Sequence, residues 1–277
     1  LFGSRVNDAM LENEGRYVHR GDESGALEPG WWIPSGRLFF SPDSTDSPAQ
    51  ELVFAREHFF LPHRVRDPFH TNTVSTESLV CYDRYNIMVS ETVDALDNRI
   101  TVGERDSDPA QPLVRHGQDY RVLQAALVMD PNRNCTAVAF DALGMVAGTA
   151  IMGKPEDRPA DGDRLTANFR ADLTPSEIDR YFANPKGPLA AQLLDDVTTR
   201  VIYDLTRFSR EPDPDRKPPA CAALLARETH VSDLSGSGKA KIQVSFSYSD
   251  GFGREVQKKV QAEPGPVPVR DGAGTII

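Results

Sequence analysis

Apolar and polar residues alternate along several segments of the chain, and this alternation predicts β-strands. The clearest segments are residues 136–140, 199–203 and 241–248. A period of two places successive side chains on opposite faces of a sheet. Each segment ends in an aromatic residue, and an aspartate follows directly or after one further residue. The pattern therefore predicts a mainly β chain whose strands end at a common motif.

The aromatic–aspartate motif forms a degenerate internal repeat. Its four copies are Tyr82-Asp83, Phe140-Asp141, Tyr203-Asp204 and Tyr248-Ser249-Asp250. An aspartate opens a turn by accepting hydrogen bonds from the backbone ahead of it, and a glycine supplies the positive φ. Gly144 and Gly253-Arg254 stand where such turns need them, so the second and fourth copies predict hairpins. The other two copies lack this glycine, although Asn86 is suited to the left-handed position in the first.

A second submotif, an aspartate followed by an asparagine, leads into the hairpins. It occurs at residues 130–134 and 94–98, and more loosely at 67–72. One unit then reads aspartate–proline turn, strand, aromatic–aspartate turn, strand. Such a unit cannot bury its apolar face alone and must stack on its neighbours. We therefore expect antiparallel hairpins stacked into a curved open sheet.

Helix-start chemistry predicts two or three short helices. Ser47 is a suitable N-cap, Pro48 suits the first helical position and Gln50 completes a capping box, so a helix should run to about residue 57. Residues 174–177 repeat this chemistry and open a helical insertion at about 174–196, with a second helix at 189–195. Residues 31–33 and 38–40 predict two strands around a Pro-Ser-Gly turn. The expected organisation is an irregular segment at 1–30, a β region at 31–270 and a truncated tail at 271–277.

Composition and charge narrow the classes of function. The chain has 277 residues and a net charge of −10, and we find no basic footprint for nucleic acid. No stretch approaches the roughly 20 apolar residues that span a bilayer. The excess of acidic residues is explained by solubility alone.

Candidate chemistry is sparse. Cys81, Cys135 and Cys221 lie far apart without zinc spacing, and we expect them to be small buried apolar residues. The histidines form no HExxH or HxH pair, Gly-x-Ser-x-Gly is absent, and residues 235–239 do not match a phosphate-binding loop. Residues 130–134 offer oxygen ligands for calcium but lack EF-hand spacing. The Arg20-Gly21-Asp22 tripeptide is a weak motif by itself. We expect no catalytic, cofactor or metal site and no enzyme activity.

The repeat resembles the Rhs/YD-repeat family, whose units centre on a Tyr-Asp-x-x-Gly-Arg turn. The best copy runs from Asp250 to Arg254, and the next best from Phe140 to Gly144. Longer strings are similar to the B-component (SpvB/TcdB-like) of ABC-type Tc insecticidal toxin complexes. They lie at residues 32–37, 59–62, 140–146, 227–234 and 246–265, so the resemblance covers about residues 30–268.

This resemblance implies a structural role in a secreted virulence complex. In that family, YD-repeat sheets of the B- and C-components form a hollow shell that encloses a cytotoxic polypeptide and delivers it through the pore of the A-component. The chain would be a fragment of the shell wall, with the rest of the same polypeptide, a C-component, the A-component and the enclosed toxin as partners. A β-rich carbohydrate- or cell-surface-binding module is the alternative.

Overall fold

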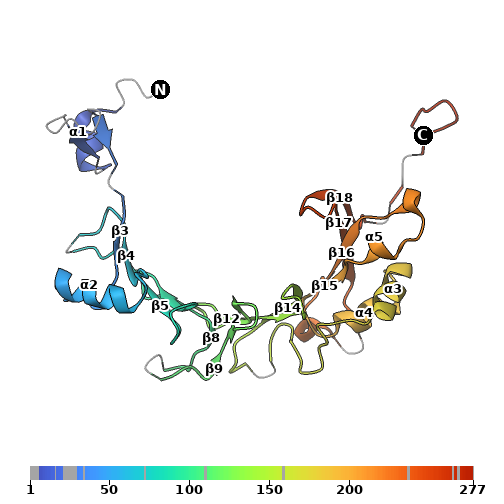
Figure 1. Ribbon diagram of the computed structural model, residues 1–277, viewed down its shortest axis with the longest axis horizontal. Helices are drawn as coiled ribbons and strands as arrows, with labels where there is room; N and C mark the ends of the chain where they lie inside the picture. The colour runs from blue at the N-terminus through green and yellow to red at the C-terminus, as the bar shows by residue number, and fades with distance from the viewer. Residues whose placement is uncertain are drawn as a thin grey trace. The chain divides into compact units, whose positions relative to one another are not determined.

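The structure is a computed structural model that divides into two compact units, residues 1–133 and 134–277 (Figure 1). It describes residues 6–15, 17–20, 30–33, 35–71, 73–108, 111–157, 160–235, 238–263, 265–266 and 269–276. Gly21 and Asp22 of the tripeptide, Pro34 of the predicted turn and residues 236–237 lie outside these ranges. Each unit is therefore described by itself.

Six strands of the main antiparallel sheet lie in the first unit, and one helix connects the first two of these strands. In spatial order they are β3 (Arg37–Phe39), β4 (Arg64–Arg66), β5 (Glu77–Tyr82), β6 (Val89–Val93), β7 (Arg99–Thr101) and β12 (Leu127–Met129), and α2 (Pro48–Glu57) connects β3 to β4. Between β7 and β12 the chain forms two short strand pairs, β8 (Gly103–Glu104) with β9 (Arg115–His116) and β10 (Gln118–Asp119) with β11 (Gln124–Ala125).

The N-terminal segment differs from the irregular structure predicted for residues 1–30. Its described part contains α1 (Asp8–Asn13), whose N-cap Asn7 accepts a hydrogen bond from the Met10 amide, and β1 (Val18–Arg20). β1 pairs with β2 (Gly30–Trp32), so β2 and β3 flank the predicted turn but belong to different strand pairs. The sequence pattern predicts these two strands but not their partners.

The second unit contains six antiparallel strands in chain order. They are β13 (Cys135–Phe140), β14 (Val146–Met152), β15 (Thr199–Asp204), β16 (Ala220–Arg227), β17 (Ile242–Ser249) and β18 (Glu255–Val260). Two helices, α3 (Pro175–Ala183) and α4 (Pro188–Leu194), lie between β14 and β15. The link from β15 to β16 contains α5 (Arg207–Arg210) and the 3₁₀ helix η2 (Pro214–Arg216), and η3 (Val231–Asp233) precedes β17.

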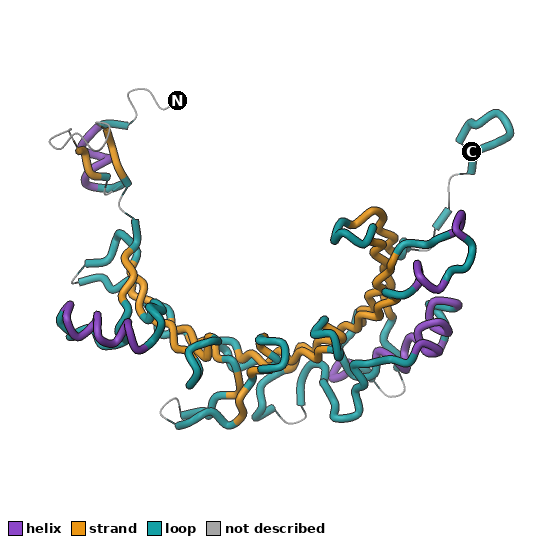
Figure 2. The backbone as a smooth tube through the Cα atoms, in the orientation of Figure 1, coloured by secondary structure: helices purple, strands orange, loops and turns teal. Residues whose placement is uncertain are grey.

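The mainly β, antiparallel and open fold predicted from the sequence is confirmed. Figure 2 distinguishes the strands from the few short helices. Among the described residues, β3 and β18 each pair with a single strand, so the sheet does not close on itself. Only α2, α3 and α4, of the five described α-helices, have seven or more residues.

The capping chemistry predicted for α2 and α3 is confirmed. In α2, the Gln50 amide donates to Ser47 Oγ and the Ser47 amide donates to Gln50 Oε1. In α3, Thr174 and Glu177 form the same reciprocal pair. These contacts satisfy backbone donors that a helix start leaves unpaired.

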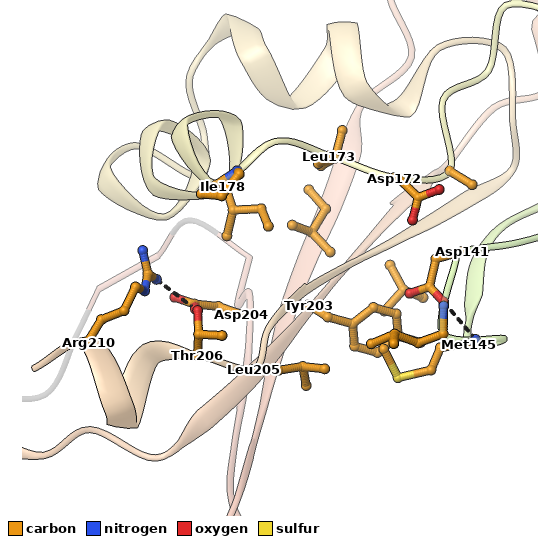
Figure 3. A pocket seen from close by; sticks show the side chains of 15 residues that line it. Asp141, Met145, Asp172, Leu173, Ile178, Tyr203, Asp204, Leu205, Thr206 and Arg210 are labelled. Atoms are coloured by element: carbon orange, nitrogen blue, oxygen red, sulfur yellow. Dashed lines mark hydrogen bonds and ion pairs between the residues drawn. The ribbon is translucent and has the colours of Figure 1, made fainter.

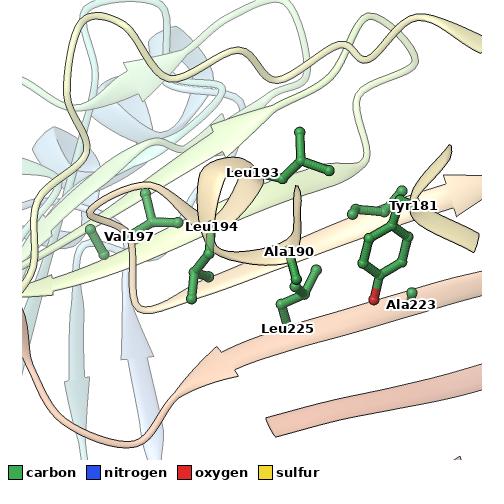
Figure 4. Close-up of a cluster of buried hydrophobic side chains, with 9 residues drawn as sticks. Tyr181, Ala190, Leu193, Leu194, Val197, Ala223 and Leu225 are labelled. Atoms are coloured by element: carbon green, nitrogen blue, oxygen red, sulfur yellow. The ribbon is translucent and has the colours of Figure 1, made fainter. Parts of the chain in front are cut away.

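The hydrophobic core of the second unit lies where α3 and α4 pack against the sheet (Figure 4). Tyr181 of α3 lies over Ala223 of β16, and Leu194 of α4 belongs to the same cluster as Leu225. All four side chains are buried. Burial of this apolar surface holds the helical insertion on the sheet.

Candidate functional site

Two of the predicted hairpin turns share one geometry. In the β13–β14 hairpin, Asp141 Oδ1 accepts hydrogen bonds from the amides of Leu143 at 2.9 Å and Met145 at 2.8 Å. In the β17–β18 hairpin, Asp250 Oδ1 accepts from the amides of Phe252 at 2.8 Å and Arg254 at 3.3 Å. The fourth loop residue is a glycine with a φ of 82° in both, which an L side chain rarely adopts.

These two hairpins and the β5–β6 hairpin each carry a strand irregularity just before the turn. The register shifts between Ala139 and Phe140, between Tyr248 and Ser249, and between Cys81 and Tyr82. A bulge places an extra residue in one strand and increases the local twist. The aromatic residue of the motif therefore lies at the bulge, and the aspartate is the first residue of the turn.

The Tyr82-Asp83 copy forms a related loop between β5 and β6. Asp83 Oδ1 accepts from the amides of Ile87 at 2.9 Å and Met88 at 3.2 Å, and Asn86 takes the left-handed position with a φ of 55°. Asp83 Oδ2 accepts from Tyr120 Oη at 2.8 Å. Burial of the Asp83 carboxylate raises its pKa. The hydrogen bonds from the backbone amides and from the Tyr120 hydroxyl lower the pKa by more, so the pKa of Asp83 lies below its usual value.

Two further aspartate turns were not identified as copies of this loop from the sequence. Asp94 accepts from the amides of Leu96 and Asn98, with Asp97 left-handed at a φ of 64°. Asp271, in the predicted tail, accepts from the amides of Ala273 and Thr275, with Gly274 at a φ of 85°. Both loops match a simpler pattern, in which an aspartate is followed three residues later by Gly, Asn or Asp and no aromatic residue is required.

The Tyr203-Asp204 copy forms no hairpin turn. Both residues lie within β15, and the chain continues into α5. Counting Asp204 as the first loop position, the fourth position is Arg207, and an arginine rarely adopts a left-handed conformation. Asp204 instead points inward, is only 5% exposed, and accepts a hydrogen bond from Arg210 Nη2 at 2.7 Å.

The structure brings the second and third copies together around one pocket of about 250 Å³ in the second unit (Figure 3). Tyr203 Oη donates to the Val146 carbonyl at 2.9 Å, which holds the end of β15 beside the Asp141 turn. The polar lining is Asp141, Asp172, Asp204, Thr206 and Arg210, and the apolar lining includes Leu173, Ile178 and Leu205.

The remaining predicted turn residues lie elsewhere. Tyr82 and Asp83 belong to the first unit, and Tyr82 Oη donates to the Pro62 carbonyl at 3.2 Å. Tyr248, Asp250, Gly253 and Arg254 form the β17–β18 hairpin and do not line the pocket. Arg254 Nε donates to Asp250 Oδ2 at 2.6 Å, so the last residue of this loop pairs with the first.

Arg200 was not predicted from the sequence and is the most deeply buried arginine beside this region. It lies on the inward face of β15 over the Phe169 ring, 4.5 Å from its centroid, and donates to the carbonyls of Leu193 and Arg170. Burial lowers the pKa of Arg200 to about 10. Alternation places Arg200 on the same face of β15 as Ile202 and Asp204, but only the tertiary contacts show that this face is buried.

The described residues contain no group of three or more His, Cys, Asp or Glu side chains that could hold a metal ion. The three cysteines are free thiols, of which Cys135 and Cys221 are buried and Cys81 is exposed. Within the part of the chain that the structure describes, no helix is long and apolar enough to cross a membrane.

Known structures share this fold over the whole chain. Neither a family model nor a curated protein matches the sequence. A crystal structure of TcdB2-TccC3 matches with a TM-score of 0.57 and 18% identity, covering 100% of this chain and 11% of that chain. The TcdB2-TccC3-Cdc42 crystal structure matches with a TM-score of 0.59 and 15% identity, covering 100% of this chain and 14% of the other.

A structure of the Photorhabdus luminescens Tc holotoxin pore gives a TM-score of 0.58 at 16% identity, covering 100% of this chain and 13% of that chain. The chain thus spans between 11% and 14% of the length of these neighbours. At such identity the likeness establishes the fold. These structural neighbours are components of Tc toxin complexes, the same complexes whose B-component the repeat motifs resemble.

Proposed function

We propose that this chain is a segment of the wall of a Tc toxin shell that encloses a cytotoxic polypeptide for delivery into a target cell. The observation that carries the proposal is the fold shared with TcdB2-TccC3 over 100% of the chain. The role is structural and requires no catalytic residue. The partners are the rest of the same polypeptide, a C-component, the enclosed toxin and a pore-forming A-component, within an extracellular complex.

The repeated turns support this proposal. Five-residue loops begin at Asp94, Asp141, Asp250 and Asp271, and in each the amide of the aspartate donates a hydrogen bond to the carbonyl of the fifth residue. A wall that grows by adding hairpins needs a short connection that local sequence can specify. The aspartate loop meets this need because its own carboxylate satisfies the turn amides.

The exposed edge of the second unit also supports the proposal. All six residues of β18 are exposed, and β18 pairs only with β17 among the described strands. An open edge presents unpaired backbone groups that a further strand satisfies. An isolated binding module would be expected to cover such an edge.

The experiment is to express the chain with the coding sequence on both sides, together with its C-component, and to image the purified particles by electron cryomicroscopy. We expect a hollow particle whose wall contains these residues, and an enclosed polypeptide that resists trypsin until the shell is denatured. A particle without a lumen, with all its polypeptides digested at equal rates, contradicts the proposal. Saturable glycan binding by a monodisperse monomer of the 277-residue chain supports the carbohydrate-binding alternative instead.

A further inference from the structure

We propose that the open edge of β18 accepts an extended segment with two consecutive acidic residues, one opposite Lys258 and the other opposite Lys259. β18 is the last strand of the second unit and pairs only with β17 among the described strands (Figure 1). The inference rests on the shell function, because this segment would be the next strand of the wall. It adds the chemistry by which the edge selects that strand.

The backbone of β18 presents free hydrogen-bonding groups at alternate residues. The amide of Gln261, just beyond β18, donates to the Val244 carbonyl of β17. An antiparallel ladder bonds every second residue to a given neighbour, so the backbone groups of Lys259 also point toward β17. The amides and carbonyls of Lys258 and Val260 therefore point to the open edge, where an added strand can pair with them.

The two lysines lie on opposite faces of the sheet. Lys259 is opposite Phe246, and the ring centroid of Phe246 lies 6.1 Å from that of Phe182 of α3. Lys259 is therefore on the face that α3 covers. Lys258 is opposite Ser247 and on the other face. An added strand meets both ammonium groups only through two adjacent residues, because adjacent side chains also point to opposite faces.

Neither lysine pairs with a carboxylate of the described residues. The ammonium of Lys259 lies 5.0 Å from the centroid of the Tyr248 ring, and all six residues of β18 are exposed. Lys186, just after α3, lines the same hollow as Lys259 and adds a third cation. This edge is thus locally basic on a chain whose net charge is −10. Opposite charges on directly opposed residues of neighbouring strands stabilise a sheet.

The same lysines exclude a second copy of the chain as the occupant. Two β18 edges in antiparallel register bring Lys258 and Lys259 of one copy against those of the other. Like charges on opposed residues destabilise strand pairing, and lysines on edge strands oppose edge-to-edge association in this way. The edge therefore discriminates by charge, while its outward backbone groups supply the pairing itself.

An apolar hollow beside Lys259 adds a second requirement. It has a volume of about 380 Å³ and is lined by Val244 and Phe246 of β17, by Ala183 of α3 and by Gln261. In an added antiparallel strand, the residue opposite Gln261 shares a face with the residue opposite Lys259. An apolar side chain at that position removes apolar surface from water. The preferred segment thus carries an apolar residue two positions before its acidic pair.

The test is a nuclear magnetic resonance titration of the ¹⁵N-labelled chain with three blocked hexapeptides, followed by amide hydrogen exchange. The first is Leu-Val-Glu-Glu-Thr-Val, whose two glutamates would oppose Lys259 and Lys258 in antiparallel register. The second has glutamines in place of both glutamates. The third is the glutamate peptide N-methylated at its second glutamate, which keeps both charges but removes the backbone donor that faces Lys258.

We expect the glutamate peptide to shift the amide signals of Lys258 and Val260 saturably and to slow their hydrogen exchange. Exchange at Lys259 should not change, because its backbone groups already point to β17. The glutamate peptide should bind roughly fivefold more tightly than the glutamine peptide, as two exposed ion pairs provide. Added salt should weaken only the glutamate peptide. The N-methylated peptide should slow exchange at neither amide.

Charge reversal with a matched control makes the test specific. Lys258→Glu/Lys259→Glu should lose the preference for the glutamate peptide and gain one for Leu-Val-Lys-Lys-Thr-Val. The control is Lys154→Glu/Lys239→Glu, which changes the net charge equally at two exposed lysines outside the strands. We expect the control to retain the preference for the glutamate peptide.

The proposal is overturned if the glutamine peptide binds as tightly as the glutamate peptide, or if the control variant loses the preference as fully as the Lys258/Lys259 variant. Equal binding of the N-methylated peptide would show attraction to the lysines without strand addition, which also overturns it. A hollow particle together with any of these results rejects this inference and leaves the shell function standing. The expected peptide preference without a hollow particle rejects the shell function instead.

Discussion

Arg210 Nη2 donates a hydrogen bond to Asp204 Oδ1 across 2.7 Å, joining α5 to the inward face of β15. The same guanidinium reaches Asp179 of α3 at 2.6 Å, so one side chain connects three elements. The carboxylate of Asp204 is almost entirely buried whereas Arg210 is partly exposed. Asp204, for which the aromatic–aspartate motif predicts a turn, is thus a buried ion-pair partner.

Replacing Arg210 with alanine should destabilise the protein by about 2 kcal/mol, because Asp204 is left as an unpaired buried charge. The measurement is urea unfolding followed by circular dichroism. Arg216→Ala is the control, since Arg216 is highly exposed and its pair with Asp213 spans 3.5 Å. We expect less than about 0.5 kcal/mol for the control. Equal effects of the two substitutions would contradict the assigned role of Arg210.

Replacing Gly253 with valine should weaken the β17–β18 hairpin by about 1–3 kcal/mol, because a β-branched residue resists the left-handed region. The φ of Gly253 is 82°, and an added Cβ meets no atom within 4 Å, so backbone conformation alone would cause the loss. Hydrogen exchange of the β18 amides measures it. Gly265→Val is the control, because Gly265 has the same free space without a positive φ. Unchanged β18 protection in Gly253→Val would rule out the assigned turn.

Acidification should destabilise the first unit through His63. Burial of His63, followed by the nearby charge of His58, lowers the pKa of its imidazole below 6.5. The unfolded chain then binds more protons than the folded chain below pH 6.5, so stability falls as the pH drops through that value. The measurement is the urea midpoint at pH 7.5 and pH 5.

His63→Phe should reduce this pH dependence while keeping the ring contacts with Phe54 and Tyr82. His116→Phe is the control, because His116 is exposed on β9. Should both variants retain the full pH dependence, His63 would not be its source.

The two capping boxes should respond differently to strong acid. The Thr174 amide, followed by Arg170, lowers the pKa of Glu177 to about 2 from 4.5. Its contribution is therefore complete above pH 4.5 and is lost as the pH falls toward 2. We expect the ¹³Cα shifts of residues 175–178 to move toward coil values in this range, and Glu177→Gln to remove the step. The α2 box uses Gln50 and should show no such step.

Thr174→Ala should cost about 1 kcal/mol at neutral pH, because it removes the N-cap of α3. Urea unfolding measures this loss as well. A stability equal to that of the unsubstituted chain would show that the cap contributes nothing to the folded state.

Much of the local structure was predictable because it depends on neighbouring residues. Ser47, Pro48 and Gln50 predicted the start of α2, and Thr174 to Glu177 that of α3, since their hydrogen bonds span only three residues. The Asp141 and Asp250 loops are equally local. The requirement for an aromatic residue was too strict, because Asp94 and Asp271 form the same loop without one.

The sequence by itself determined the β class, the helix starts and the aspartate loops, because hydrogen bonds within a few residues specify each of them. Only the tertiary structure decided that Asp204 pairs with Arg210, that β2 pairs with β1, and that Asp141 and Tyr203 line one pocket. None of these relationships lies within one turn or helix cap, even though Asp204 and Arg210 are only six residues apart. The strand alternation sets which residues share a face of the sheet but not which partner each side chain or strand meets, so contacts between separate elements had to decide them.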